Sequence, residues 1–362
     1  MIYFIIIVIV VVIGIYLFIT QPKFGRQPDT VVKKRIASSA GFKNGQFQNK
    51  SITPDLTDGA TYYSVSKEFF FKKSKRRTPK GAIPSIKTDL NSLQEDSLVW
   101  MGHSSYYLQV NGKRMLIDPV LSGAASPVKF TTRSFAGSDI YSPSDIPPLD
   151  YLFISHDHWD HLDYDTVLKL IPKTARIITG LGTGAHLRRW KIDPEKITEM
   201  DWNETIEPEP GFKIHGLPAR HFSGRGLKRN RALWLSFLVE TAGMKSLLGG
   251  DSGYDTHFKE IGDRFGPIDL AVLECGQYNK SWKHIHMMPE EVVQASIDLR
   301  AKQLLPVHWA KFSLSLHDWD EPIRQVLRYA EKAGVPVIHP MIGEPVMLRQ
   351  SGSYSTWWEK ID

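Results

Sequence analysis

A short run of metal-ligand residues, placed directly after an apolar segment, limits what this chain can fold into. His156, His158, Asp160 and His161 stand together as HDHWDH after the apolar residues 150–155. Imidazoles two residues apart in an extended loop can converge on one cation, and the carboxylate and third imidazole can turn toward a second one. The motif therefore predicts a metal site at a strand end. A His-rich surface loop is the alternative, and the rest of the chain argues against it.

Two metal ions need more than four protein ligands, and three isolated residues downstream could supply them. His221, Asp251 and His308 each follow an apolar stretch, where a strand is expected to stop and a loop to begin. Sheet-based folds present their chemistry at such places. Asp118, which lies before Pro119, is expected to orient a ligating imidazole or else to open a turn. Two adjacent metals could activate water for a displacement at phosphorus or at a carbonyl.

Strands and helices alternate along the chain from about residue 97. Apolar stretches of strand length are separated by helical stretches at 164–170, 289–300 and 321–333, which indicates one α/β domain. The Gly-Leu-Gly-Thr-Gly-Ala run at 180–185 imitates a dinucleotide-binding fingerprint. Because nothing else in the chain builds the second mononucleotide half, we do not expect a nucleotide cofactor.

The order of the ligand residues resembles the metallo-β-lactamase superfamily, in which HxHxDH is followed by a lone His, a lone Asp and a lone His. Within it, the chain is most similar to the phospholipases D that hydrolyse N-acylphosphatidylethanolamine. The Gly-Asp-Ser-Gly-Tyr and Phe-Gly-Pro segments make this narrower match. The shared motifs are Trp100-Met-Gly-His-Ser104, Ile117-Asp-Pro119, Ala125-Ser-Pro127, the stretch 154–163, Gly250-Asp-Ser-Gly-Tyr254, the stretch 258–267, the stretch 286–291 and Val307-His-Trp309.

The resemblance implies an α/β fold of the metallo-β-lactamase-like αββα type, a sandwich of two β-sheets with helices outside and the metals at one sheet edge. It also implies two zinc ions, with another divalent metal such as Mn²⁺ as an alternative. By the family pattern Asp251 bridges the two ions. One ion is then held by His156, His158 and His221, and the other by Asp160, His161 and His308.

His286 is the further catalytic residue that the resemblance implies. A departing alkoxide must be protonated, and histidine has a suitable pKa near neutrality. By residue type alone, His286 could equally be a surface or capping residue ahead of a helix that begins with Pro289. The family has Gln where this chain has Ile285 and Tyr where it has Trp159, which bears on the substrate and not on the metals.

The function implied is that of a membrane-anchored, di-metal phosphodiesterase of phospholipase D type. It would hydrolyse N-acylphosphatidylethanolamine-like phospholipids to an N-acylethanolamine and phosphatidate. One alternative is a metal-dependent lactonase similar to L-ascorbate-6-phosphate lactonase, and another is a non-catalytic membrane scaffold. A basic loop after His221 either holds phosphate or headgroups or lies exposed; its cations are Arg225, Lys228, Arg229 and Arg231.

Residues 1–20 are expected to form a transmembrane anchor. The segment carries no charge and is long enough to cross a bilayer core, and it lacks the basic start and small-residue cleavage site of a signal peptide. The positive-inside rule then predicts a single-pass protein with its catalytic domain in the cytoplasm. A single cysteine, Cys275, allows no intrachain disulfide, which agrees with a reducing compartment. The basic residues that follow the anchor are Lys23, Arg26, Lys33, Lys34 and Arg35.

Residues 21–94 are expected to be a basic lead segment that wraps a hydrolase domain of residues 95–362. Within it, Phe69-Phe-Phe71 runs into a cluster of cations that ends near Lys80, which suits the headgroup layer of an anionic membrane. A core-packing aromatic run followed by solvated charges is the alternative. No recognition motif for nucleic acid accompanies the charge, so phospholipid and membrane are the expected partners.

Overall fold

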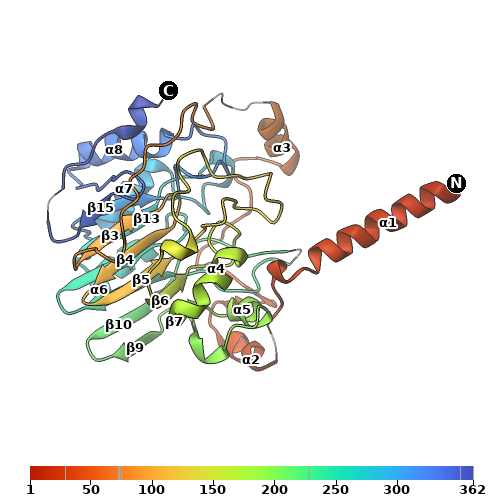
Figure 1. The fold of residues 1–362 in the computed structure, drawn as a ribbon, viewed down its shortest axis with the longest axis horizontal. Coiled ribbons are helices and arrows are strands. Elements are labelled where there is room, and N and C mark those ends of the chain that lie inside the picture. The colour runs from red at the N-terminus through yellow and green to blue at the C-terminus, as the bar shows by residue number, and fades with distance from the viewer. Residues whose placement is uncertain (29, 72–73, 75, 227, 351, 362) are drawn as a thin grey trace.

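Two β-sheets pack face to face in the computed structural model, which describes residues 1–362 except 29, 72–73, 75, 227, 351 and 362 (Figure 1). The seven-stranded sheet is antiparallel from β15 to β5 and parallel from β5 to β8. Its strands, in spatial order, are β15 (Pro345–Met347), β3 (Ser97–Trp100), β4 (Tyr106–Val110), β5 (Lys113–Ile117), β6 (Leu149–Ile154), β7 (Thr174–Gly180) and β8 (Ile197–Met200).

The six-stranded sheet mirrors this arrangement. It is antiparallel from β9 to β12 and parallel from β12 to β14. Its strands, in spatial order, are β14 (Leu304–Val307), β13 (Leu270–Glu274), β12 (Met244–Leu248), β11 (Ser236–Thr241), β10 (Phe212–Leu217) and β9 (Thr205–Glu209).

Helices cover the outer faces of both sheets, so the predicted αββα sandwich is confirmed (Figure 1). α4 (Tyr164–Leu170) and α5 (Gly184–Arg189) lie on the seven-stranded sheet. α6 (His257–Phe265), α7 (Pro289–Asp298) and α8 (Glu321–Ala333) lie on the six-stranded sheet. The sequence predicted α7 to extend to residue 300, but it ends at Asp298 because Arg300 adopts a left-handed φ of 52°.

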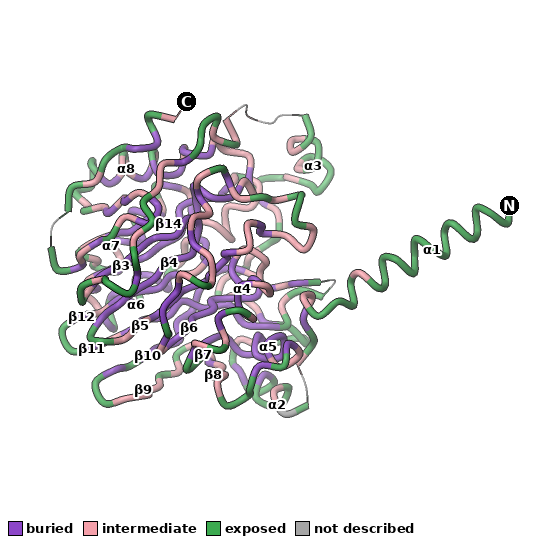
Figure 2. The backbone as a smooth tube through the Cα atoms, in the orientation of Figure 1, coloured by how far each residue is buried: buried purple, intermediate pink, exposed green. Residues whose placement is uncertain are grey.

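The central strands are buried on both faces, which explains their unbroken apolar character. In β6, Tyr151 and Phe153 point to the core between the sheets, whereas Leu152 and Ile154 point to the core under α4 and α5. The Phe153 ring meets Phe237 of the opposite sheet at a centroid distance of 5.2 Å. Figure 2 shows the strands as the buried centre of the molecule.

α1 (Ile2–Ile19) stands away from the sandwich, and none of its residues is buried (Figure 2). It has a mean hydropathy of 3.3 and is long and apolar enough to cross a membrane. The sequence pattern did not indicate the short elements that follow it. These are α2 (Thr30–Ser38), the hairpin of β1 (Phe42–Lys43) and β2 (Gln46–Phe47), and α3 (Tyr62–Phe71).

The lead segment lies against the sandwich over much of its length. Arg35 forms an ion pair with Glu204, and Asn49 exchanges two hydrogen bonds with the backbone of His221. Short 3-10 helices complete the chain at Pro22–Phe24, Pro143–Asp145, Ile171–Lys173, Pro194–Lys196, Lys280–Trp282 and Trp357–Lys360. The division at residue 94 stays a prediction.

Candidate metal centre

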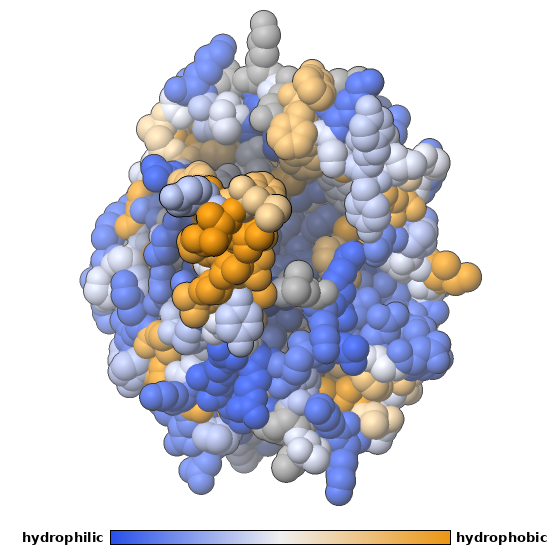
Figure 3. Space-filling model, turned by 90° about the vertical axis from the view of Figure 1, so that its right-hand side faces the viewer, coloured by the Kyte–Doolittle hydropathy of each residue, from blue (hydrophilic) through white to orange (hydrophobic). Residues whose placement is uncertain are grey.

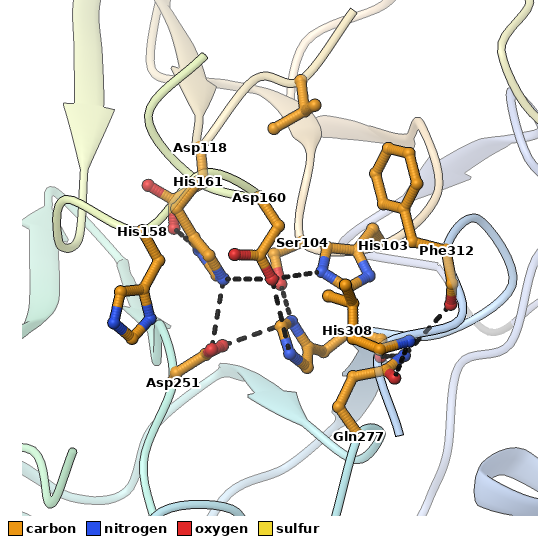
Figure 4. A network of polar contacts seen from close by, with 12 residues as sticks. His103, Ser104, Asp118, His158, Asp160, His161, Asp251, Gln277, His308 and Phe312 are labelled. Atoms are coloured by element: carbon orange, nitrogen blue, oxygen red, sulfur yellow. Dashed lines mark hydrogen bonds and ion pairs between the residues drawn. The ribbon is translucent and has the colours of Figure 1, made fainter. Parts of the chain in front are cut away.

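The predicted ligands leave their strands at one edge of the sandwich. The HDHWDH loop follows β6, His221 follows β10, and Asp251 and His308 follow β12 and β14. β6 is parallel to its neighbours and so are β12 to β14, so the carboxyl ends of these strands meet at the same edge. Figure 4 shows the resulting cluster of imidazoles and carboxylates around Asp251.

One group of ligand atoms is formed by His156, His158, His221 and Asp251, all within 4.8 Å of one another. His158 Nδ1 lies 2.9 Å from His156 Nε2 and 3.2 Å from His221 Nε2. Ligands bound tetrahedrally to zinc at about 2.0 to 2.1 Å are separated by roughly 3.3 Å. The spacing of this group therefore suits a single cation.

The second group is formed by His103, Asp160, His161 and His308. Asp251 lies between the two groups. Its Oδ2 is 3.2 Å from His161 Nε2 and 3.7 Å from His221 Nε2, and its Oδ1 is 3.2 Å from His308 Nδ1. The structure thus brings all seven predicted ligands together, with Asp251 within contact distance of residues from both groups. Their roles as ligands stay a prediction.

The donor set fits divalent cations. His161 Nε2 and Asp251 Oδ1 are buried and have no hydrogen-bond partner among the described residues. Burial lowers the pKa of His156 and of His308 well below 6.5, which leaves neutral imidazoles with free lone pairs. Burial raises the pKa of Asp251, but the imidazoles of His161 and His308 outweigh this and hold it well below its ordinary value. An ionised, buried carboxylate beside the neutral imidazoles of His156 and His308 is an arrangement that a metal ion satisfies.

Asp118 orients His161, as the sequence suggested. Its Oδ2 accepts a hydrogen bond from His161 Nδ1 at 2.9 Å, and Ser155 donates to both of its oxygens. This bond turns His161 Nε2 toward Asp251 (Figure 4). Burial lowers the pKa of His161, but Asp251, Asp160 and Asp118 outweigh it and raise the pKa well above 6.5.

His103 was not singled out from the sequence as a site residue. It is fully buried, and its Nε2 lies 2.9 Å from Asp160 Oδ2 (Figure 4). Its backbone is tied to the loop after β14: His308 N donates to His103 O, and His103 N donates to Trp309 O, both at 2.9 Å. The signal that could have found it is the one used for the other ligands, since His103 follows the apolar strand β3.

His286 lies beside the predicted metal ligands, in the loop between the 3-10 helix Lys280–Trp282 and α7. Its ring centroid is 5.1 Å from that of His221 and 5.3 Å from that of His308. Its Nδ1 is 3.5 Å from Oε1 of the buried Glu274. Burial raises the pKa of Glu274 to about 7, and burial of His286 is outweighed by Glu274 and Asp251, which raise the pKa of the histidine. The side chain of His286 is 12% exposed, against 2% for Asp251.

The basic side chains of the loop after His221 lie in three different environments. Arg225 is buried beneath the metal loop, where it donates to the carbonyl oxygens of Leu162 and Asp157. Arg229 pairs with Asp55 at 2.9 Å. Lys228 and Arg231 line a cavity together with Arg225.

In the glycine-rich run at 180–185, two backbone amides that could bind a phosphate are already engaged within the chain. Gly182 N and Gly184 N both donate to Glu199 Oε1, at 2.7 and 3.2 Å. The carboxylate of the chain itself thus takes the place that a nucleotide phosphate would need.

Comparison with known proteins gives consistent results. The model of the beta-lactamase superfamily domain matches residues 113–309. The N-acyl-phosphatidylethanolamine-hydrolyzing phospholipase D 1 of Caenorhabditis elegans is 32% identical over 323 residues, which cover 80% of this chain and 86% of that protein. The mitochondrial enzyme of the same name from Saccharomyces cerevisiae is 34% identical over 250 residues, 65% of this chain and 52% of that protein. A metallo hydrolase from the archaeon Ignicoccus hospitalis has the same fold, with a TM-score of 0.53, 18% identity, and coverage of 69% of this chain and 97% of that one.

Proposed function

Since this chain belongs to the beta-lactamase superfamily, we propose that it is a membrane-anchored phosphodiesterase of phospholipase D type. Its substrates would be N-acylphosphatidylethanolamine-like phospholipids, cleaved to an N-acylethanolamine and phosphatidate. The observation that carries the proposal is the two adjacent ligand groups. Asp251 of the first group lies 3.2 Å from His161 and from His308 of the second, and His286 lies beside them. Two relatives that are named for this activity support it.

The proposed metal complement is two divalent cations, zinc in the first place and Mn²⁺ as the alternative. When bound, such a pair supplies Lewis acidity and activates water at neutral pH. His156, His158 and His221 would hold one cation. Asp160, His161 and His308 would hold the other, with Asp251 between them. Imidazole and carboxylate ligands of this number suit zinc.

The side chains of the site divide the remaining tasks. Asp118 fixes the ring of His161 through Nδ1, and Ser104 Oγ lies 2.8 Å from His308 Nδ1, so both rings are held in one orientation. His286 carries a proton that it can give to the departing alkoxide. Glu274 lies behind this histidine and favours its protonated form.

The membrane side of the proposal depends on α1 and α3, which lie on the same side of the molecule in Figure 1. In α3, Phe70 and Phe71 are 73% and 81% exposed, which suits contact with a headgroup layer. Phe69 instead stacks on Trp282 at 6.5 Å, so only part of the aromatic run faces outward. Lys72, Lys73 and Lys75 of the basic cluster lie outside the described residues. We propose a cytoplasmic catalytic domain, because the cations follow α1.

One assay tests the proposal. Purified protein is incubated with phosphatidylcholine, phosphatidylethanolamine and N-acylphosphatidylethanolamine in detergent, with a soluble lactone as a further substrate. Products are identified by mass spectrometry, and metal content is measured on the same sample. Release of N-acylethanolamine and phosphatidate supports the proposal. Hydrolysis of the lactone without any lipid product would favour the lactonase alternative.

Asp251→Asn is the matched variant. The bridging carboxylate contributes charge to both ions, and a neutral amide of the same shape does not. We expect loss of activity together with reduced metal occupancy, measured by inductively coupled plasma mass spectrometry. Unchanged turnover with two metals per chain would show that the ligand assignment is wrong.

A further inference from the structure

A cavity of about 380 Å³ lies where α1 meets the sandwich, next to the HDHWDH loop, and its described lining contains none of the seven predicted ligands. Ile19, the last residue of α1, forms part of its wall. Figure 3 views the molecule from the side on which α1 projects and shows its apolar side chains beside a hollowed part of the surface. The cationic residues that line the cavity are Arg26, Arg189, Arg225, Lys228 and Arg231.

The cavity has one carboxylate in its described lining, and that carboxylate is already engaged. Asp157 Oδ1 accepts a hydrogen bond from Gly224 N at 2.7 Å, and its Oδ2 lies 3.1 Å from His186 Nε2. Among the described residues that line the cavity, five Lys and Arg side chains therefore face a single carboxylate. Such a wall attracts anions.

The environment of Arg225 is a second indication that the cavity binds an anion. It is 3% exposed, and its Nη2 has no hydrogen-bond partner among the described residues. Its Nε and Nη1 are engaged by carbonyl oxygens of Lys23, Asp157 and Leu162. A buried guanidinium nitrogen without an acceptor is costly, and an oxyanion in the adjoining cavity removes the cost.

We propose that this cavity binds the phosphate of an anionic phospholipid headgroup. The inference rests on the proposal that α1 spans a membrane, because only then does a cavity walled by Ile19 lie at the bilayer surface. Basic pockets beside a membrane helix are suited to anionic headgroups. Inorganic phosphate has the same chemistry, and the experiment below separates the two sources.

The site is connected to the metal loop by direct contacts. Phe18 of α1 meets Phe24 at a centroid distance of 5.2 Å, and Phe24 meets Trp159 of the HDHWDH motif at 5.1 Å. The Arg225 guanidinium lies 3.9 Å from the centre of the Trp159 ring. Arg225 also donates to the Leu162 carbonyl oxygen at 2.6 Å, so it joins the cavity to the loop that carries four predicted ligands. An anion held by Arg225 would steady this joint between anchor and metal centre.

The test compares lipid retention by the full chain in detergent, measured by native mass spectrometry. Phosphatidylglycerol and phosphatidylcholine are supplied in equal amounts, and the mass of the retained lipid shows that it is intact. The variant is Arg26→Gln with Lys228→Gln, because both residues line the cavity and both are exposed, so the fold should tolerate their substitution. The control is Lys33→Gln with Lys34→Gln, which removes the same charge from exposed positions of α2 outside the cavity.

We expect preferential retention of phosphatidylglycerol, weakened on the order of tenfold in the cavity variant and unchanged in the control. Equal retention of both lipids, or equal loss in variant and control, would overturn the proposal. Displacement of the lipid by millimolar inorganic phosphate would assign the cavity to a soluble anion instead. The readout needs no turnover, so a failure of the proposed hydrolytic activity would leave this result intact.

Discussion

At the scale of single residues, His286 distinguishes proton donation from metal binding. It lies next to His221 and His308 but also faces Glu274, whose carboxylate favours a protonated ring. We expect His286→Asn to lower turnover on lipid about a hundredfold or more while both metals stay bound. Turnover and metal content of the same preparation check this.

The leaving group provides the control for His286. A nitrophenyl phosphodiester departs without a proton, so the variant should lose much less activity on it than on lipid. Equal losses on both substrates would mean that His286 binds phosphate or shapes the site. Loss of one metal ion would make it a ligand.

His103 is the second residue whose role can be measured. Its Nε2 lies 2.9 Å from Asp160 Oδ2, so it holds a predicted ligand in place. Loss of such a supporting contact typically weakens metal affinity about 10- to 100-fold. We expect this for His103→Asn in a chelator competition. His215→Gln serves as the control, because His215 is also buried but contacts Thr205 and Glu240. Unchanged affinity in His103→Asn would contradict the role.

At the scale of elements, the start of α6 contains a pH-sensitive residue. His257 is the first residue of α6, it is 2% exposed, and burial lowers its pKa from 6.5 to about 4. Near a helix N-terminus a positive charge is further disfavoured. Because the folded pKa is depressed, the unfolded chain takes up the proton first as pH falls. The contribution of neutral His257 to folding stability is therefore complete above about pH 6.5 and is lost progressively toward pH 4.

This residue alone should lower the free energy of unfolding by about 2 kcal/mol between pH 7 and pH 5. The measurement is urea unfolding of metal-free protein at both pH values, which removes metal release from the comparison. The other buried histidines also titrate, so the informative quantity is the difference between wild type and His257→Gln. An equal pH dependence in both proteins would show that His257 contributes nothing.

At the scale of the whole molecule, anchor and catalytic domain should be separable. The predicted ligands all lie downstream of residue 150. Removal of residues 1–19 keeps Pro22 O, which accepts a hydrogen bond from the indole of Trp190, and should leave hydrolysis of detergent-dispersed lipid intact. Binding of the truncated protein to anionic vesicles should weaken as salt rises, because exposed charges are screened.

The exposed rings of α3 should account for part of the remaining vesicle binding. We expect Phe70→Ser with Phe71→Ser to weaken it further, as measured by vesicle sedimentation. Ile297→Ser is the control, since this exposed residue belongs to α7, away from α1 in Figure 1. Binding that is indifferent to both salt and the α3 substitutions would leave α3 with no role at the membrane.

The sequence alone determined the features that depend on local pattern. Apolar runs predicted the strands that end before His156, Asp251 and His308, because strand formation and ligand spacing are visible within a few residues. It predicted α8 at Glu321–Ala333, which ends at Gly334 in a left-handed conformation. The uncharged length of α1 likewise needed no tertiary information.

Only the tertiary structure decided which distant residues meet. His103 pairs with Asp160 across 57 positions, and Arg225 bonds Lys23 across 202, and neither pairing can be read from the residues around either partner. The same holds for Phe69, which packs on Trp282 although its neighbours Phe70 and Phe71 are exposed. Helix and strand patterns are set by neighbouring residues, whereas these contacts are set by how two sheets and a long lead segment pack against each other.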